Sequence, residues 1–495
     1  MSGAVASYDL VLRGGSVLDG TGAAAVGADV AIAGDRIAAI DRVPRGSARQ
    51  EIDVAGLTVA PGFIDVHTHD DRALLATPAM DAKVSQGVTT VISGNCGISL
   101  APLVPRGALP PPLDLIGDEE SYRYARFGDY LDALDAAPPA TNAACLVGHS
   151  TLRVGAVDAL ERAADESEIA AMRRALGEAL AAGAIGLSSG LWYAPANAAP
   201  RSELVALAKE LGAAGAIYTT HMRDEADHVL DSLDETFAVG REASVPVVIS
   251  HHKVLGRQNF GRTLETLPKI AAAIAAQPLG LDAYPYIASS TVLRPQNVPL
   301  ALKVLITWSK SRPEAAGREL AAIAREWDVS EVEACARLQP AGAIYFMMNE
   351  ADVRRVLAFE HTMIGSDGLP HDVHPHPRLW GTFARVLGHY CREERLFPLA
   401  EAVRKMTGLP AARFGLAGRG RLAPGAYADV TVFDADAIID RATFAAPTTP
   451  AAGIHLVLVN GEAVWRDGAA TGARPGRALR RQHMQAEQRA NQAAS

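Results

Sequence analysis

The sequence predicts an α/β protein, a (β/α)8 TIM-like barrel with a small β-sandwich domain built from both chain ends. Three observations support this fold class. Eight short apolar segments alternate with helix-forming sequence through the middle of the chain, and short strands with Gly and Asp turns recur near both ends. The chain also has 495 residues, which is too long for one simple core.

The eight predicted barrel strands are joined mostly by Ala-, Glu- and Arg-rich sequence, which favours helices. The strands are expected at 63–69, 89–95, 143–149, 184–189, 216–222, 245–251, 279–284 and 362–367. Each is apolar along its length, as expected for a parallel strand that is buried on both faces. A doubly wound open sheet is the alternative, but no glycine-rich phosphate-binding motif follows the first strand.

Strands at the two ends of the chain predict the second domain. Residues 8–40 and 425–465 contain short apolar strands separated by turns such as Asn460-Gly461. Because chain termini often lie close together, these strands can form one domain. We expect a small domain from 1–60 and 416–480, a barrel at 61–415 with an insertion over its mouth at about 285–360, and a polar tail or frayed helix at 481–495.

Composition and charge restrict the partners. Hydrophobic residues make up 49% and charged residues 21%, the formal net charge is −9, and no basic block stands out, so we expect no nucleic-acid partner. No apolar stretch long enough for a membrane span and no signal peptide are recognisable. The four cysteines form no CxxC pair, which is typical of a reducing compartment, so we expect a cytoplasmic protein. The oligomeric state stays open.

Reactive side chains stand at the ends of most predicted strands. His67 and His69 end the first strand, and residues at this spacing point to the same face of a strand. The other strand-end residues are Cys96, His149, His221, His251, Tyr284 and Asp367. Such residues at the C-terminal ends of barrel strands are typical of an active site. Imidazole and thiolate together favour zinc over magnesium or calcium.

A metal site with a nearby carboxylate predicts a hydrolase. The expected metal ligands are His67, His69, Cys96, His221 and His251. Zinc lowers the pKa of bound water and polarises a carbonyl, and Asp367 can move a proton from that water to a leaving nitrogen. Hydrolysis of an amide or ester-like bond is therefore expected.

Two of these residues have other interpretations. Cys96 could be a small buried core residue, although the flanking Gly94 and Gly97 favour a tight turn that presents its side chain. His149 could be a metal ligand, a substrate contact or a hydrogen-bonded core residue. We favour a position in the substrate pocket or directly behind the residues that line the site.

The motifs resemble the amidohydrolase superfamily, and within it the branch of D-aminoacylases, the N-acyl-D-amino-acid deacylases. The resemblance covers essentially the whole chain through GFIDVHTHDD, GNCGIS, THMRDE, SHHK, DAYPY, GAIYFMM, IGSDGLPHD and HPHPRLWGTF. It implies a tightly held zinc on Cys96, His221 and His251. It also implies a second, weaker metal position at His67 and His69, with Cys96 as a bridge, and Asp367 as the catalytic acid and base.

One departure from the wider superfamily concerns the number of metals. Many superfamily members carry a carboxylated lysine that bridges two metals. The end of the fourth predicted strand, residues 185–190, reads IGLSSG and contains no lysine. We therefore expect one functional zinc rather than a symmetric two-metal centre.

The resemblance implies N-acyl-D-amino acids as small-molecule substrates, cleaved to a D-amino acid and a carboxylate. The residues expected to bind substrate are Lys253, Tyr284, Ser290, Arg378, Tyr193 and His149. A guanidinium such as that of Arg378 can bind a carboxylate through two parallel hydrogen bonds. Neutral and hydrophobic D-side chains are expected to be favoured. Arg294 leaves N-acyl-D-glutamate or N-acyl-D-aspartate as the alternative.

Two other functions stay open. A cyclic amidase, such as a dihydropyrimidinase or dihydroorotase, is the alternative enzyme, against which Cys96 and the missing lysine count. A non-enzymatic scaffold with a degenerate barrel would be expected to lack ligands, and all of the expected ligands are present.

Overall fold

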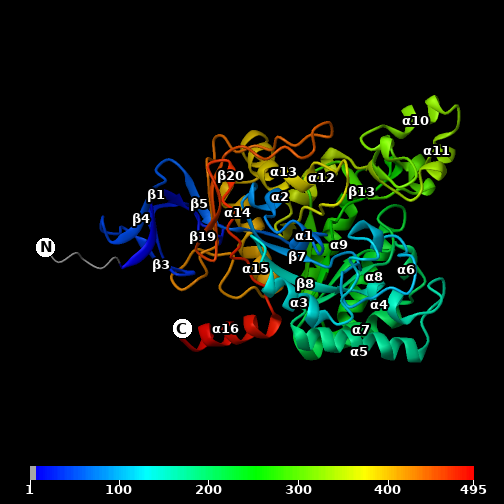
Figure 1. Cartoon of the computed structure of the whole chain (residues 1–495), viewed down its shortest axis with the longest axis horizontal. Coiled ribbons are helices and arrows are strands. Elements are labelled where there is room, and N and C mark those ends of the chain that lie inside the picture. The colour runs from blue at the N-terminus through cyan, green and yellow to red at the C-terminus, as the bar shows by residue number, and fades with distance from the viewer. Residues whose placement is uncertain (1–6, 495) are drawn as a thin grey trace.

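The computed structural model describes residues 7–494 and confirms the predicted fold class (Figure 1). A parallel eight-stranded sheet in the order β16-β12-β11-β10-β9-β8-β7-β6 forms the barrel. Its strands are β6 (Phe63–Asp65), β7 (Val88–Ser93), β8 (Asn142–Gly148), β9 (Gly186–Gly190), β10 (Ile217–His221), β11 (Val247–Ile249), β12 (Leu279–Ala283) and β16 (Thr362–Ile364). All eight coincide with predicted segments, and most of them end earlier than predicted.

The barrel closes where its first and last strands meet. Beyond β6 and β16, the backbone N–H of Asp367 donates to the carbonyl of His67 at 2.8 Å, and Thr68 forms a parallel bridge to Gly368. This seam lies at the carboxyl ends of the strands. It therefore fixes two expected site residues, His67 and Asp367, directly beside each other.

Helices surround the barrel and follow its strands. They are α1 (Ala73–Ala76), α2 (Asp81–Val84), η1 (Leu113–Leu115), α3 (Phe127–Ala136), α4 (His149–Ala156), α5 (Glu166–Ala182), α6 (Ala194–Asn197), α7 (Arg201–Ala214), α8 (Val229–Ala243), η2 (Arg257–Asn259), α9 (Thr263–Ala276), α12 (Glu350–Ala358), α13 (Arg378–Arg385), the π-helical η5 (Val386–Glu393), α14 (Leu399–Met406) and α15 (Gly408–Phe414). The longest, α5, begins with a capping box in which Asp165 accepts from the Glu168 N–H.

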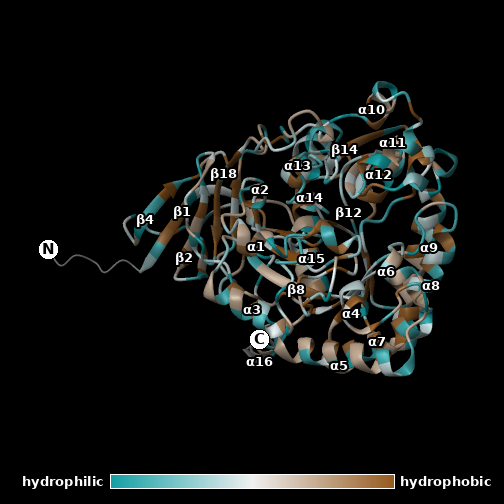
Figure 2. Ribbon diagram, turned by 45° about the vertical axis from the view of Figure 1, so that its right-hand side comes forward, coloured by the Kyte–Doolittle hydropathy of each residue, from teal (hydrophilic) through white to brown (hydrophobic). Residues whose placement is uncertain are grey.

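The small domain joins strands from both chain ends in one mixed sheet. Its strands are β1 (Tyr8–Val17), β2 (Val26–Ala33), β3 (Arg36–Asp41), β4 (Ala48–Asp53), β5 (Thr58–Pro61), β17 (Val430–Phe433), β18 (Ile454–Val459), β19 (Glu462–Arg466) and β20 (Ala469–Ala470). The sheet order is β20-β19-β18-β17-β5-β1-β2-β3, and β4 pairs with β1. The antiparallel pair of β5 and β17, with Val59 opposite Val432, joins the two halves. Figure 2 shows hydrophobic residues along these strands.

The insertion between β12 and β16 folds around a separate hydrophobic cluster. It contains β13 (Ala288–Val292), η3 (Pro295–Leu300), β14 (Lys303–Ser309), η4 (Pro313–Ala315), α10 (Leu320–Glu326), α11 (Glu331–Leu338) and β15 (Ala341–Phe346). The three strands form an antiparallel sheet in the order β13-β15-β14, so β13 is an edge strand. In Figure 1, α10 and α11 project from the barrel beside β13.

The C-terminal segment, expected as a tail or a frayed helix, forms the helix α16 (Arg481–Ala494). Met484 is 7% exposed and belongs to the hydrophobic cluster inside the barrel, together with Ile64 and Ile217. Arg481 donates to the carbonyls of Leu180 and Ala214, which lie in the last turns of α5 and α7. The helix therefore packs across the amino-terminal end of the barrel, opposite the mouth.

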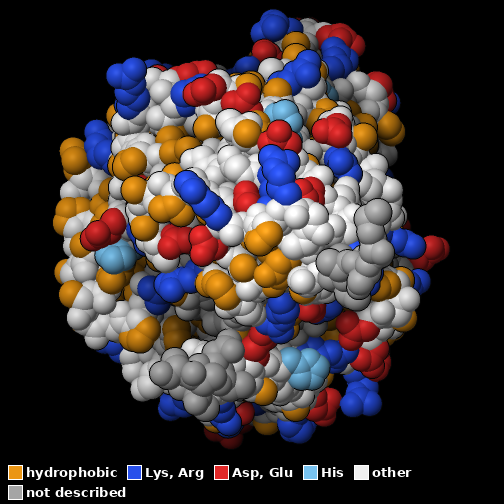
Figure 3. Space-filling model, turned by 90° about the vertical axis from the view of Figure 1, so that its left-hand side faces the viewer, with side chains coloured by type: hydrophobic (Ala, Val, Ile, Leu, Met, Phe, Trp, Pro, Cys, Tyr) orange, Lys and Arg blue, Asp and Glu red, His pale blue; other side chains and the backbone are white. Residues whose placement is uncertain are grey.

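The surface carries both signs of charge. On the face shown in Figure 3, Lys and Arg side chains are interspersed with Asp and Glu. None of the helices within residues 7–494 combines the length and hydrophobicity that a membrane span requires.

Candidate metal centre and active site

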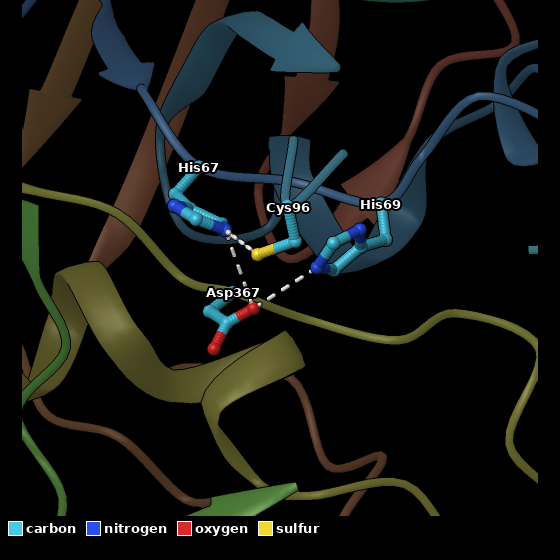
Figure 4. A group of neighbouring side chains, drawn as sticks. All are labelled: His67, His69, Cys96 and Asp367. Atoms are coloured by element: carbon cyan, nitrogen blue, oxygen red, sulfur yellow. Dashed lines mark hydrogen bonds and ion pairs between the residues drawn. The ribbon is translucent and has the colours of Figure 1, made fainter. Parts of the chain in front are cut away.

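Six expected site residues converge at the barrel mouth. His67 and His69 follow β6, Cys96 follows β7, and the remaining three lie at or just beyond the ends of β10, β11 and β16: His221, His251 and Asp367. All six side chains are buried. Figure 4 shows His67, His69, Cys96 and Asp367 pointing toward one another. The convergence follows from the fold, because parallel barrel strands end on the same rim.

The first group of possible ligands contains His67, His69, Cys96 and Asp367, whose ligand atoms lie within 4.8 Å of one another. His67 Nε2 lies 3.2 Å from Cys96 Sγ, and His69 Nε2 lies 3.1 Å from Asp367 Oδ1. His67 Nε2 is 3.5 Å from the same carboxylate oxygen. The carboxylate therefore faces both imidazoles of the His-x-His pair.

The second group shares Cys96 with the first and adds His221 and His251. Cys96 Sγ lies 3.3 Å from His251 Nε2. Burial opposes ionisation of the Cys96 thiol, but the imidazoles of His67 and His251 outweigh it and hold the pKa of the thiol well below its ordinary value. Cys96 is therefore placed as a thiolate between the two groups.

The backbone at three site residues is left-handed, with φ of 52° at Cys96, 37° at His251 and 51° at Asp367. Non-glycine residues rarely adopt this conformation, and it concentrates at functional sites. Around Cys96 the turn depends on glycine, because a Cβ on Gly94 would lie 2.1 Å from the Leu146 carbonyl oxygen and one on Gly97 2.6 Å from the Gly190 nitrogen. The expected tight turn is therefore present.

Two buried carboxylates that the motifs did not single out orient the ligands. Glu225 Oε1 lies 3.1 Å from His251 Nδ1 and 2.8 Å from Lys253 Nζ. Asp282 accepts from the backbone N–H of His251 at 2.9 Å and lies 3.3 Å from His67 Nδ1. Carboxylates behind metal-binding histidines fix the ring orientation. The available signal was the strand-end position of Asp282 and the spacing of Glu225 from His221.

Lys253 is held within this network. Its Nζ also lies 2.7 Å from His251 Nδ1. Burial opposes ionisation of Glu225, but Lys253 and the histidines outweigh it and keep the pKa of that carboxyl well below its ordinary value. The ammonium group of Lys253 is therefore compensated by an ionised carboxylate before substrate enters.

The residues fit zinc by two tests. Within residues 7–494, His69 Nδ1 and His221 Nδ1 are buried without a hydrogen-bond partner, which is uncommon for a buried polar atom. The donor set is a thiolate, imidazoles and one carboxylate, which suits zinc better than an all-oxygen cation. Cys96, His221 and His251 provide one position, and the group with His67, His69 and Asp367 provides an adjoining one.

A cavity above the metal group carries polar and apolar walls. Its polar lining includes Lys253, Tyr284, Ser290 and Tyr193, all four of which were expected there. The Tyr193 hydroxyl lies 3.0 Å from Thr291 Oγ1. The apolar lining is formed by Leu115, Trp192, Leu255, Leu300, Met347 and Leu369. Residues of the insertion, such as Ser290 and Met347, thus form the wall that faces the metal group.

Arg378 lies behind this wall and reaches the acid. It is 1% exposed, its Nη1 lies 2.9 Å from Asp367 Oδ2, and its Nη2 donates to the Ser290 carbonyl at 3.2 Å. Within the described residues, Arg378 Nε and the hydroxyls of Ser289 and Ser290 are buried without a hydrogen-bond partner. Several unsatisfied donors beside a cavity form a site that an anionic oxygen can satisfy.

His149 is the expected residue that the structure places elsewhere. Its Nε2 lies 2.9 Å from Glu203 Oε1, and Arg153 Nη1 lies 2.6 Å from the same carboxylate. All three side chains are fully buried, His149 begins α4, and it does not line the cavity. These contacts favour the hydrogen-bonded core interpretation of His149 over a substrate contact.

A comparison with protein families matches residues 50–465 to the model of an amidohydrolase family. The chain belongs to the amidohydrolase family. Among curated relatives of this amidohydrolase, D-aminoacylase from Alcaligenes xylosoxydans xylosoxydans is 58% identical over 474 residues, covering 96% of this chain and 98% of that protein. The N-acyl-D-aspartate and N-acyl-D-glutamate deacylases of the same organism are 51% and 50% identical, each with 96% of both chains covered.

Solved structures agree with these relatives. One of them is a D-aminoacylase structure with 58% identity to this amidohydrolase and a TM-score of 0.93, covering 96% of this chain and 100% of that one. It addresses the functional role of the binuclear metal centre of that enzyme, with one-metal activation and second-metal attenuation. N-acyl-D-glutamate deacylase from Bordetella bronchiseptica, complexed with zinc and a phosphonate mimic of the tetrahedral intermediate, has 46% identity, a TM-score of 0.93 and the same coverage.

Proposed function

We propose that this amidohydrolase is a zinc-dependent N-acyl-D-amino-acid deacylase that hydrolyses the amide bond and releases a D-amino acid and a carboxylate. The observation that carries the proposal is the cavity in which the metal group and Asp367 stand beside the buried, unsatisfied donors of Ser290 and Arg378. A substrate with an amide next to a free carboxylate needs both features. The high similarity to D-aminoacylase over 96% of the chain supports the same substrate class and the D-configuration.

The residues of the chain divide the chemistry between them. Cys96, His221 and His251 would hold zinc, which supplies Lewis-acid polarisation of the carbonyl and a lowered pKa of water when bound. Asp367 accepts a proton from the attacking water and then donates it to the nitrogen of the departing D-amino acid. In the structure this carboxylate is buried and available, because Arg378 and His67 outweigh burial and keep the pKa of Asp367 well below its ordinary value.

The substrate carboxylate is proposed to bind opposite the metal group. Arg378 and Ser290 supply donors from one side, and Tyr284, whose ring lies 4.6 Å from the Arg378 guanidinium carbon, supports the guanidinium. Lys253 and Tyr193 line the same cavity. These contacts would hold the scissile amide near Asp367, which is how binding energy is converted into reactive geometry.

One functional zinc is the occupancy that we propose. The strand β9 and its end carry no lysine, and the two possible metal positions share a single thiolate, Cys96. The second position includes Asp367, so a second ion there would engage the carboxylate that has to carry the proton. This arrangement supports a tight activating position and a weaker second position.

Neutral and hydrophobic side chains are the proposed preference. Trp192, Leu255 and Met347 give the cavity large apolar walls. Arg294 stacks on Trp192, with its guanidinium carbon 4.2 Å from the ring centre, and lines a neighbouring groove. An acidic side chain is the second candidate, because Arg294 is half-buried and packs on Trp192, whose ring lines the cavity.

Three substrates test these proposals together: N-acetyl-D-methionine, N-acetyl-L-methionine and N-acetyl-D-glutamate, each with the zinc-loaded protein. Turnover of N-acetyl-D-methionine alone supports the deacylase with a hydrophobic preference. A higher kcat/KM on the glutamate derivative would keep the reaction and transfer side-chain recognition to Arg294. Turnover of the L-isomer would contradict the proposed carboxylate contacts. Faster turnover of hydantoin or dihydrouracil would replace the proposal with a cyclic amidase.

The proposed setting is the cytoplasm. The four cysteines Cys96, Cys145, Cys335 and Cys391 are all free and buried, which supports a reducing compartment.

A further inference from the structure

A buried histidine that takes no part in the proposed chemistry lies along the chain between Asp367 and Arg378. His376 is 2% exposed and lies in the loop from Asp367 to Arg378. Its Nδ1 accepts a hydrogen bond from the backbone N–H of Arg378 at 2.9 Å, and its Nε2 lies 3.1 Å from the Ala288 carbonyl oxygen. A backbone N–H can only donate and a carbonyl can only accept, so both contacts require the neutral ring with its proton on Nε2.

The surroundings keep His376 neutral and fixed. Burial and the nearby Arg378 guanidinium hold the pKa of His376 well below its ordinary value. The ring makes edge-to-face contacts with Tyr286 and Phe444, at centroid distances of 5.1 Å and 5.0 Å. Phe444 in turn contacts Phe346 at the end of β15, at 4.7 Å. Two hydrogen bonds and two aromatic contacts therefore fix the orientation of the imidazole.

The same loop completes the edge of the insertion sheet. The edge strand β13 offers the carbonyl of Ala288 to His376 and the carbonyl of Ser290 to Arg378 Nη2. Residues two apart on the loop thus bond to residues two apart on the strand, and carbonyls at this spacing point to the same side. The backbone of Arg378 and its side chain are fixed against one strand, and Ser290 of that strand also lines the cavity.

We propose that His376 is a positioning residue that holds Arg378 at the place from which it binds the substrate carboxylate. The inference rests on the proposed deacylase function. The decisive contact is the acceptor at Nδ1, because it fixes the backbone from which the guanidinium projects between Asp367 and Ser290. A displacement of about 1 Å at such a point can lower the rate by roughly 100-fold.

Two variants separate this role from packing. Glutamine in His376→Gln can still donate to Ala288 but offers no acceptor at the place of Nδ1. Asparagine in His376→Asn offers an acceptor at that place but is too short to reach Ala288. We expect the KM of His376→Gln for N-acetyl-D-methionine to rise roughly 10-fold or more, and the KM of His376→Asn to stay within about 3-fold of wild type. If the glutamine variant does not fold, His376→Met, which has no polar side-chain atom to replace Nδ1, takes its place with the same expectation.

His374 provides the matched control. It lies in the same loop, is half-buried, and its Nε2 lies 2.8 Å from the Phe444 carbonyl oxygen. Glutamine at this position can still donate to the Phe444 carbonyl, so His374→Gln should leave KM unchanged. Zinc content is measured for every variant, to show that the metal position is intact.

The outcomes are distinct. An unchanged KM in His376→Gln, or an equal rise in His376→Gln, His376→Asn and His374→Gln, would overturn the positioning role and leave His376 as a packing residue. Wild-type protein that hydrolyses no N-acetyl-D-amino acid would instead overturn the proposed function itself. The result expected from the structure is a raised KM in His376→Gln and a KM close to that of wild type in His376→Asn.

Discussion

Arg378 Nη1 lies 2.9 Å from Asp367 Oδ2, so the residue proposed to bind the substrate carboxylate also contacts the proposed acid and base. The other oxygen of Asp367 faces His69 Nε2 at 3.1 Å. The carboxylate is thereby held between the metal group and the substrate-binding arginine. Binding of substrate by Arg378 and proton transfer by Asp367 should therefore be coupled.

Asp367→Asn should remove the proton acceptor and keep the fold. We expect kcat to fall by roughly 100-fold or more, because an amide cannot take the proton of the attacking water. Zinc content, measured by metal analysis, should stay near that of wild type, since Cys96, His221 and His251 are untouched. Activity close to wild type would remove Asp367 from the proposed role.

Arg378→Lys keeps the positive charge but loses the planar pair of donors. We expect KM for N-acetyl-D-methionine to rise about 10-fold, because lysine cannot bind a carboxylate through two parallel hydrogen bonds and cannot bond to the Ser290 carbonyl with the same geometry. Steady-state kinetics check this expectation. A KM that does not change would place the substrate carboxylate elsewhere.

Cys96→Ala should lower the zinc content of the purified protein to well below one ion per chain. The thiolate belongs to both possible metal positions, so its loss weakens each of them. Cys145→Ala is the matched control, because Cys145 is also buried but lies outside both groups; burial raises the pKa of its thiol to about 12. Equal zinc content in both variants would return Cys96 to a packing role.

Acid should weaken the fold through Glu203. Burial opposes ionisation of this carboxyl, but His149 and Arg153 outweigh it and lower the pKa of Glu203 from 4.5 to about 2. The unfolded state therefore binds the proton more readily than the folded state. The ionised Glu203 stabilises the fold fully above about pH 4.5, and this contribution to the free energy of unfolding is lost as the pH falls from about 4.5 to about 2. Urea unfolding at several pH values measures the loss.

Glu203→Gln tests the same network at neutral pH. The variant leaves the buried Arg153 without its carboxylate, which costs about 3–5 kcal/mol of unfolding free energy, and it should flatten the acid dependence. Glu210→Gln is the control, since its partner Arg173 is exposed and such surface pairs contribute about 0–1 kcal/mol. Similar losses in the two variants would contradict a structural role for the buried network.

Met484→Ala should destabilise the barrel from its amino-terminal end. The side chain is buried in the interior cluster, and truncating a buried methionine costs about 2–5 kcal/mol. Chemical unfolding measures this loss, and kcat should not change because the active site lies at the opposite end. No loss of stability would show that α16 does not contribute to the core.

The predictability of the site follows from its position on the fold. Each barrel strand ends at the same rim, so residues far apart in sequence, such as His67 and Asp367, could be brought together from strand order alone. The same rule placed His149 at the substrate pocket, which the structure does not support. Strand β8 ends at Gly148, so His149 is the first residue of α4 and its imidazole points toward Glu203. A strand-end position places the backbone of a residue at the barrel rim, but packing decides which way its side chain points.

The carboxylates behind the ligands were not predictable in this way. Asp282 lies within β12 and Glu225 lies four residues after His221 in the connection from β10 to α8, and their roles depend on contacts to His251 that only the tertiary packing creates. Likewise, the polar composition of 481–495 left a frayed helix and a tail open, whereas the buried Met484 and the side-chain bonds of Arg481 hold residues 481–494 as a helix.

The sequence by itself determined the barrel, the metal-binding residue types and the reaction class, because strand periodicity and ligand chemistry are local properties of the chain. Only the tertiary structure decided which oxygen faces which nitrogen: that Arg378 contacts Asp367, and that His376 fixes Arg378 against the insertion sheet. These relationships join segments that are distant in sequence. They arise from the closure of the barrel and the packing of the insertion over its mouth, which no local pattern encodes.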